Sequence, residues 1–310
     1  MKPNKEKHKW QFAPYSRGKG KGTCPSCGFR KKYSFYVDTD TGVILSPEYG
    51  KCDKINCSHH YSPYEYPPDS NGSGVCVDVR LFEEKDYYHV LPVSLFRKSF
   101  SKRVRYTDNL SLFLLAEFPD KQRVKDVLTK YGVGCSTLFK GKSTVFWQIS
   151  ADKNLRTGKI MKYTEEGKRD KEGGYPKMNW AHTFYKGDYE LEQCLFGDHL
   201  LTKEKKVRVF ESEKTAIIMS IVDQHKDKYV NIATGGLYNL TEIVLERLKP
   251  YDVTFFPDKG KAFYVWEKKV EENKGDSRWK MSTILEEDID LKDGDDMADK
   301  YFFDKTKFIS

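Results

Sequence analysis

Apolar and polar positions alternate most regularly over the last third of the chain. Four short apolar runs indicate strands, and a segment with helical spacing follows each of them. The expected strands are 207–210, 229–233, 252–256 and 281–285, and the expected helices are 214–222, 240–248, 262–270 and 297–303. Strands that alternate with helices of about ten residues are typical of βαβ units, so we expect a mostly parallel sheet.

The middle of the chain, residues 77–205, has a mixed pattern of helical and alternating segments. The expected elements are helices around 112–115 and 124–128, a strand at 143–149 with a hairpin partner at 159–163, and a loop over 164–182. The second helix is expected to end before Gly132, because glycine commonly follows the last residue of a helix. This segment is therefore predicted to be an α/β region.

Composition and charge narrow the class of protein. The chain is 32% charged, but its 14% of aromatic residues is enough to build cores, which argues against disorder. Residues 1–32 hold ten Lys or Arg against one acid, whereas 286–304 hold nine acids against two lysines. This asymmetry predicts one part that faces a polyanion and another that binds cations.

Two further features of the sequence bear on the location of the protein and on its contact with membranes. No apolar stretch approaches the roughly 20 residues of a membrane span, so no membrane partner is expected. The chain has seven cysteines, an odd number, and four of them have metal-like spacing. That pattern favours a metal site over a disulfide framework and a reducing, cytoplasmic location.

Two cysteine pairs carry the clearest metal signal. The ligands expected are Cys24 and Cys27, from a Cys-Pro-Ser-Cys sequence, and Cys52 and Cys57, with four residues between them. Two close pairs suit a tetrahedral Zn²⁺ site, and 33–37 with 41–45 alternate as a hairpin between them. His59 and His60 are alternatives to Cys57 as the fourth ligand. The pattern predicts a structural zinc ribbon beside a basic arm, a surface suited to nucleic acid.

Acidic side chains follow the predicted parallel strands. The carboxyl ends of such strands meet at one edge of the sheet, where functional groups gather. A single acid after a strand is more often a turn or capping residue, but a series at successive strands favours Mg²⁺ or Mn²⁺. The residues concerned are Glu211 and Glu213 after the first strand, Gly235 and Gly236 after the second, Asp258 after the third, and Asp293, Asp295, Asp296 and Asp299 after the fourth.

These motifs resemble those of Toprim primases from phages, plasmids and bacterial mobile elements. Val-Phe-Glu211-Ser-Glu213-Lys214 is similar to the first Toprim motif, and Ala-Thr-Gly235-Gly236-Leu to the glycine turn. Phe-Phe-Pro-Asp258-Lys-Gly260 resembles the Asp-x-Asp motif, and the run from Asp293 to Asp299 resembles the late acidic motif. The resemblance covers about 100 residues, and an upstream zinc ribbon is common in such primases.

The resemblance implies metal-dependent nucleotidyl transfer on single-stranded DNA, in replication of a mobile element. Partners would be nucleotides, single-stranded DNA and a helicase acting in trans. Catalytic residues would be Glu211, Asp258 and Asp296, which with Asp299 would hold Mg²⁺ or Mn²⁺. Phosphates would be bound by Arg156, Lys159, Lys162, Lys214, Gly235 and Gly236, together with Lys168 and Arg169.

The expected architecture is an α+β multidomain chain. It comprises a basic flexible arm (1–22), a β-rich zinc ribbon (23–62), a linker (63–76), a basic α/β subdomain (77–205) and a C-terminal Toprim-like α/β domain with a mostly parallel sheet (206–310). The linker is indicated by its prolines and glycines, which interrupt regular structure.

One departure from the Toprim pattern leaves other functions open. Gly260 stands where the second Asp of Asp-x-Asp is expected, and Asp295, Asp296 or Asp299 would have to compensate for its loss. The alternatives are a catalytically degenerate Toprim and zinc-ribbon protein that only binds DNA, a Toprim nuclease, and a zinc-stabilised protein-interaction module. The chain contains no Gly-x4-Gly-Lys-Ser/Thr loop, the ATPase motif that usually accompanies Toprim nucleases.

Overall fold

The computed structural model describes two compact units, and each is considered by itself. It describes residues 8–13, 21–27, 32–40, 45, 49–54, 57, 59–65, 89–187, 189–225 and 228–307. The first unit comprises 1–81 with 92–95, and the second 82–91 with 96–310. Large parts of the predicted arm (1–22) and linker (63–76) lie outside the described residues.

The first unit is a small antiparallel sheet. Its strand order is β1-β3-β4-β5, with β2 paired to β3. The bounds are β1 Trp10–Phe12, β2 Lys21–Gly22, β3 Tyr33–Asp38, β4 Gly50–Cys52 and β5 His60–Tyr61. The predicted strand at 33–37 is confirmed as β3, and the partner predicted at 41–45 lies outside the described residues except for Leu45. In the described residues, β4 pairs with β3 and brings Cys52 opposite Tyr33.

The second unit contains an antiparallel sheet of order β6-β7-β8-β9. Helix α1, Val93–Phe100, starts in residues assigned to the first unit and ends in this one. The further elements are α2 Asn109–Glu117, α3 Lys121–Lys130, β6 Val133–Ser136, β7 Ser143–Ile149, β8 Leu155–Lys162, β9 Met178–Trp180, η2 Ala181–Phe184 and η3 Asp198–Leu200. The two predicted helices and the β7–β8 hairpin are confirmed. Sequence patterns missed β6, and they missed β9, which lies within the predicted loop at 164–182.

A parallel sheet of order β11-β10-β12-β13 forms the rest of this unit. Its elements are β10 Lys206–Phe210, α4 Glu213–Val222, β11 Tyr229–Ala233, η4 Leu237–Asn239, α5 Glu242–Leu248, β12 Val253–Phe256, α6 Lys261–Asn273, β13 Trp279–Met281 and α7 Met297–Lys307. The parallel arrangement is confirmed. The fourth strand was predicted too late, at 281–285, because the Trp279 side chain, 2% exposed, anchors the strand in the core.

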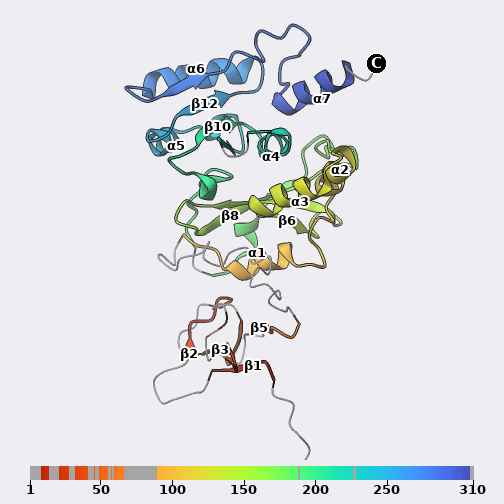
Figure 1. Ribbon diagram of the computed structural model, residues 1–310, viewed down its shortest axis with the longest axis vertical. Helices are drawn as coiled ribbons and strands as arrows, with labels where there is room; N and C mark the ends of the chain where they lie inside the picture. The colour runs from red at the N-terminus through yellow and green to blue at the C-terminus, as the bar shows by residue number, and fades with distance from the viewer. Residues whose placement is uncertain are drawn as a thin grey trace, which may run out of the picture. The chain divides into compact units, whose positions relative to one another are not determined.

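Alternating side chains on this sheet explain its two helical layers. Val207 and Val209 of β10 face a core completed by α5 and α6, whereas Phe210 faces a core shared with α2, α3 and α4. Because β10 contributes to both cores, the sheet is covered on both faces, as parallel sheets require. Within this unit α2 packs against β7 and α3 against β6, on one side of the antiparallel sheet (Figure 1). The edge where β10, β11 and β12 end is left for polar side chains.

No helix in the described part of the chain combines the length and the apolar character needed to cross a bilayer.

Candidate functional site

The first unit brings four cysteines together. The Sγ atoms of Cys24, Cys27, Cys52 and Cys57 all lie within 4.8 Å of one another. The Cys24–Cys57 and Cys27–Cys52 Sγ–Sγ distances are both 3.8 Å, too long for disulfide bonds. Four thiolates about 2.3 Å from a tetrahedral Zn²⁺ would lie about 3.8 Å apart. The cysteines therefore fit a structural zinc ion without rearrangement.

Burial gives a second reason to expect a cation at this cluster. Cys24 and Cys52 are 1% and 5% exposed, and burial raises the pKa of both thiols. Buried thiolates require a compensating positive charge, which Zn²⁺ supplies. The two histidines considered as ligands lie against tyrosines instead, with His59 Nε2 3.4 Å from the Tyr33 hydroxyl and His60 Nε2 3.1 Å from the Tyr36 hydroxyl.

The zinc content of variants should show whether Cys57 or a histidine is the fourth zinc ligand. We expect the wild-type chain to contain about one equivalent of zinc, and Cys57→Ala to lose most of it, because three ligands hold the ion less tightly than four. His59→Ala serves as the control and should retain the metal. Elemental analysis of the purified proteins checks this, and loss of zinc from His59→Ala alone would identify the histidine as the ligand.

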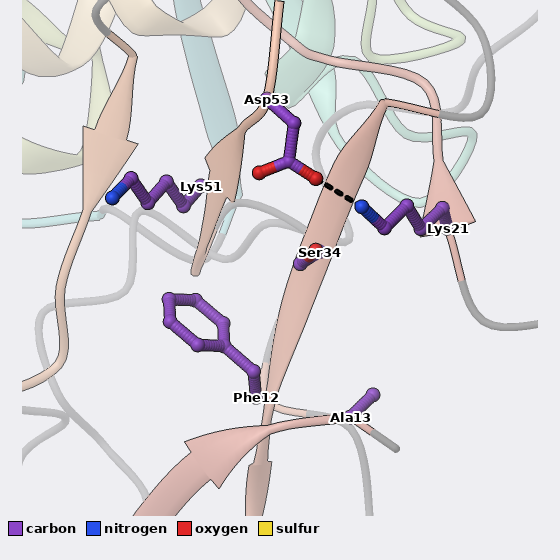
Figure 2. Close-up of a pocket in the computed structure, with 6 residues that line it drawn as sticks. All are labelled: Phe12, Ala13, Lys21, Ser34, Lys51 and Asp53. Atoms are coloured by element: carbon purple, nitrogen blue, oxygen red, sulfur yellow. Dashed lines mark hydrogen bonds and ion pairs between the residues drawn. The ribbon is translucent and has the colours of Figure 1, made fainter. Parts of the chain in front are cut away.

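A pocket of about 510 Å³ opens on the sheet of the same unit (Figure 2). It is lined by Phe12, Ala13, Lys21, Ser34, Lys51 and Asp53. Lys21 and Asp53 form an ion pair on one side, while Lys51 extends along another. Phe12 is 40% exposed and stacks on Tyr36 with ring centroids 4.3 Å apart. Tyr33 and Tyr36 are buried, whereas Phe12 and Tyr64, which is 49% exposed, keep accessible rings in this unit.

In the second unit, acidic side chains gather where the parallel strands end. Glu211 directly follows β10 and is half-buried, and Asp258 lies two residues beyond β12. Burial raises the pKa of Glu211, opposed by Arg169 and by a hydrogen bond from the Leu237 backbone. Burial and the charges of Glu211 and Asp296 raise the pKa of Asp258 to about 8. The negative charges of neighbouring carboxylates therefore contribute to the raised pKa values at the strand ends.

Such a cluster of oxygen ligands fits a hard divalent cation. A carboxyl whose pKa is raised to about 8 by burial, and further by neighbouring carboxylates, marks a site short of positive charge. Within the described ranges, only the four cysteines place three or more ligand atoms within 4.8 Å of one another. The carboxylates therefore do not form a group of three ligand atoms within that distance, and Mg²⁺ is commonly held by only one or two carboxylates, with water and phosphate as its other ligands.

Asp296 and Asp299 also have a structural role. Asp296 Oδ1 accepts hydrogen bonds from the backbone of Ala298 and Asp299, and Asp299 Oδ2 accepts one from the Asp296 backbone. This reciprocal pattern is a capping box at the start of α7. The Thr215 hydroxyl on α4 also donates to Asp296, which fixes the carboxylate beside the strand ends. Asp296 retains acceptor capacity, because each carboxylate oxygen has two lone pairs.

Glu213, the second acid after β10, is engaged inside the protein. Its side chain is 3% exposed and its Oε2 lies 3.1 Å from Lys159 Nζ of β8. Lys159 also donates to the Gly235 carbonyl at 2.8 Å. Gly235 has φ +80°, and a Cβ there would lie 2.9 Å from Glu213 Oε1, so this turn requires glycine. These contacts therefore connect β8 of the antiparallel sheet to the start of α4 and to the turn after β11 of the parallel sheet.

The basic residues expected to bind phosphate fall into two groups. Arg156 is buried, with its guanidinium 2.8 Å from Glu192 and 3.7 Å from Asp152, and Lys162 donates to the Gly141 carbonyl. Lys214 and Arg169 instead lie near the carboxylates. Burial lowers the pKa of Lys214, opposed by Asp296 and Asp299, and exposed Arg169 lowers the pKa of Glu211 and Asp258. Arg169 is thus the basic side chain best placed to meet a ligand phosphate.

Backbone geometry explains the glycine at position 260. Gly260 has φ +82°, and a Cβ there would lie 2.8 Å from Asp293 Oδ1. Its N–H donates to Glu286 Oε1 at 2.7 Å, and Lys259 exchanges backbone hydrogen bonds with Gly294 and Asp295. The turn after Asp258 is therefore fixed against the acidic 286–295 segment. Asp293 occupies the space that a side chain at position 260 would take.

Two family models match the chain. A domain of unknown function, DUF6371, matches residues 108–259, and a zinc beta-ribbon finger matches residues 8–72. No curated protein matches the chain by sequence. The zinc-ribbon match and the four-cysteine cluster together support a structural zinc ion.

Solved structures similar to the chain include two from bacteriophage T7. The primase fragment of the T7 primase-helicase protein is 14% identical, with a TM-score of 0.43, over 93% of this chain and 97% of that one. A chain from a complex of T7 lagging-strand DNA polymerase with primase domains bound to an RNA/DNA hybrid and dTTP is 18% identical, with a TM-score of 0.40, over 58% of this chain and 82% of that one.

Proposed function

We propose that the chain is a primase-like protein of the Toprim type that performs metal-dependent nucleotidyl transfer on single-stranded DNA. The observation that carries the proposal is the group of mutually repelling carboxylates at the ends of β10 and β12, with the Asp258 pKa at about 8. Glu211, Asp258 and Asp296 would hold Mg²⁺ or Mn²⁺, with Asp299 at the rim. The ion would supply charge stabilisation at the transferring phosphorus.

The side chains around the carboxylates bind phosphate or compensate charge. Arg169 and Lys168, both exposed, bind the phosphates of the nucleotide or the template, while Lys214 moderates the charge of Asp296 and Asp299. In the transfer, the primer 3′-oxygen forms a bond to the α-phosphorus and the bond to pyrophosphate breaks. The zinc ribbon holds single-stranded template, with Phe12 and Lys51 as its accessible aromatic and basic contacts.

Primer synthesis tests this proposal. Wild-type protein, labelled nucleotides, single-stranded DNA and Mg²⁺ or Mn²⁺ should give short products, and Glu211→Gln should reduce their rate about 100-fold or more. DNA affinity should not fall in this variant, because a carboxylate contributes no attraction to phosphate. Glu204→Gln makes the same change at an exposed site and should leave synthesis intact.

A non-catalytic DNA-binding protein is the second candidate. It is favoured by the burial of Glu213 against Lys159 and by the glycine at position 260, since both reduce the number of available carboxylates. This alternative predicts no products from the wild type, with DNA affinity that falls as salt rises. Cleavage of the DNA without synthesis would instead identify a nuclease that uses the same carboxylates.

A further inference from the structure

Two tyrosines and a lysine form an exposed strip beside the carboxylates. Tyr238, in η4, is 64% exposed, and Tyr264, on α6, is 65% exposed. Lys261, the first residue of α6, lies with its Nζ 5.8 Å from the centroid of the Tyr238 ring. Because residues three apart on a helix are neighbours on its surface, Lys261 and Tyr264 share one face of α6. We call these three residues the tyrosine strip.

The backbone beneath the strip is held firmly. The Leu237 carbonyl accepts a hydrogen bond of 2.9 Å from the Trp266 indole, whose ring is fully buried. Lys269 of α6 donates to the Leu240 carbonyl at 2.9 Å. The opposite face of α6 is packed in the core through Ala262, Phe263, Trp266 and Val270. The two tyrosine rings therefore project from backbone that is already ordered, which lowers the entropic cost of binding.

The strip is continuous with the carboxylate site. Leu237, whose backbone hydrogen bond lowers the pKa of Glu211, immediately precedes Tyr238. On the other side, Asp258 precedes Lys261 by three residues across the fixed turn at Gly260. The first acid of α6, Glu267, lies three residues after Tyr264 and borders the strip, whereas Glu271 and Glu272 come later along the helix. The end of α6 nearest the carboxylates thus presents Lys261 and Tyr264 ahead of the first acid of this helix.

We propose that the tyrosine strip binds single-stranded nucleic acid, with bases stacked on Tyr238 and Tyr264 and a backbone phosphate paired with Lys261. Exposed aromatic rings accept bases of any sequence, and a lysine next to them can pair with the phosphate that joins two neighbouring nucleotides. The inference rests on the proposed function, since it places the strand whose end reaches the carboxylates. It assigns a strand-holding role to residues outside the metal site.

Equilibrium binding of a labelled oligothymidine to the full chain, measured by fluorescence anisotropy without added magnesium, tests the strip. We expect Tyr238→Ala and Tyr264→Ala each to raise the Kd about five- to tenfold, and both Tyr→Phe variants to bind like the wild type, because stacking needs only the ring. Lys261→Met should reduce the slope of log affinity against log salt by about 0.7. Ile243→Ala, an 80% exposed side chain on α5, is the control and should bind normally.

The possible results of this experiment distinguish a failure of the strip proposal from a failure of the proposed function. Unchanged affinity in both Tyr→Ala variants would overturn the strip even if the wild type synthesises primers. Weakened binding in these variants would support it even if no primers are made. Thermal unfolding is the folding control. Because the side chains are exposed, the variants should unfold at the same temperature as the wild type, and a loss of binding then does not reflect misfolding.

Discussion

Asp258→Asn is expected to unfold at a higher temperature than the wild type when magnesium is absent, and to gain no stability when magnesium is added. The Asp258 pKa is raised from 3.8 to about 8 by burial and by Glu211 and Asp296. Between those pH values the folded state holds more protons than the unfolded state, so stability falls as pH rises. Above about pH 8 the folded protein carries the full penalty of a buried, repelled carboxylate, which asparagine removes.

The difference in stability between Asp258→Asn and the wild type is expected to depend on pH. The advantage of Asp258→Asn should be small near pH 4 and should grow to a few kcal/mol by pH 8, which corresponds to about 5 °C or more in melting temperature. Magnesium should raise the melting temperature of the wild type only, because the cation replaces the proton on Asp258. The same substitution should abolish primer synthesis.

An exposed aspartate provides the matched control. Asp276→Asn makes the same chemical change outside the carboxylate cluster and should alter stability by less than about 0.5 kcal/mol at any pH. Thermal unfolding followed by circular dichroism between pH 5 and pH 8.5, with and without magnesium, measures all three proteins. Equal stabilisation of the wild type and Asp258→Asn by magnesium would show that the cation binds elsewhere.

Lys159→Met is expected to lower the free energy of unfolding by about 3–5 kcal/mol, because it leaves the Glu213 carboxylate buried without its partner. Glu213 is 2% exposed and Lys159 is 7% exposed, so water cannot replace the lost charge. The double variant Lys159→Met, Glu213→Gln removes both charges and should recover much of the loss. Urea unfolding measures the three proteins, and the denaturant dependence should stay constant if only stability changes.

Lys206→Met is the comparison for this pair. Lys206 forms an ion pair with Asp252 at 3.3 Å, but its side chain is 62% exposed, so its loss should cost less than about 1 kcal/mol. If Lys159→Met is no more destabilising than Lys206→Met, the buried pair does not hold the two sheets together.

Local patterns were sufficient for the elements of the parallel sheet. Val207, Val209 and Phe210 form an apolar run that faces two cores, and a helix of ordinary length follows each strand. The errors fall where a neighbour decides the structure. Gly134 obscured β6, which forms because it pairs with β7, and the fourth strand starts early because Trp279 fills the core. The β9 strand lies in a polar stretch whose partner, β8, defines it.

The candidate site divides in the same way. The two cysteine pairs and the order of the acids after the strands can be predicted from the sequence, because ligand spacing and the position of a residue at a strand end are local features. Folding, in contrast, pairs Lys159 with Glu213, 54 residues away, and Arg156 with Glu192. It also leaves Arg169, Tyr238 and Lys261 accessible beside the carboxylates. Charges pair by distance in space, so a sequence shows which groups are present but not which ones the fold leaves available.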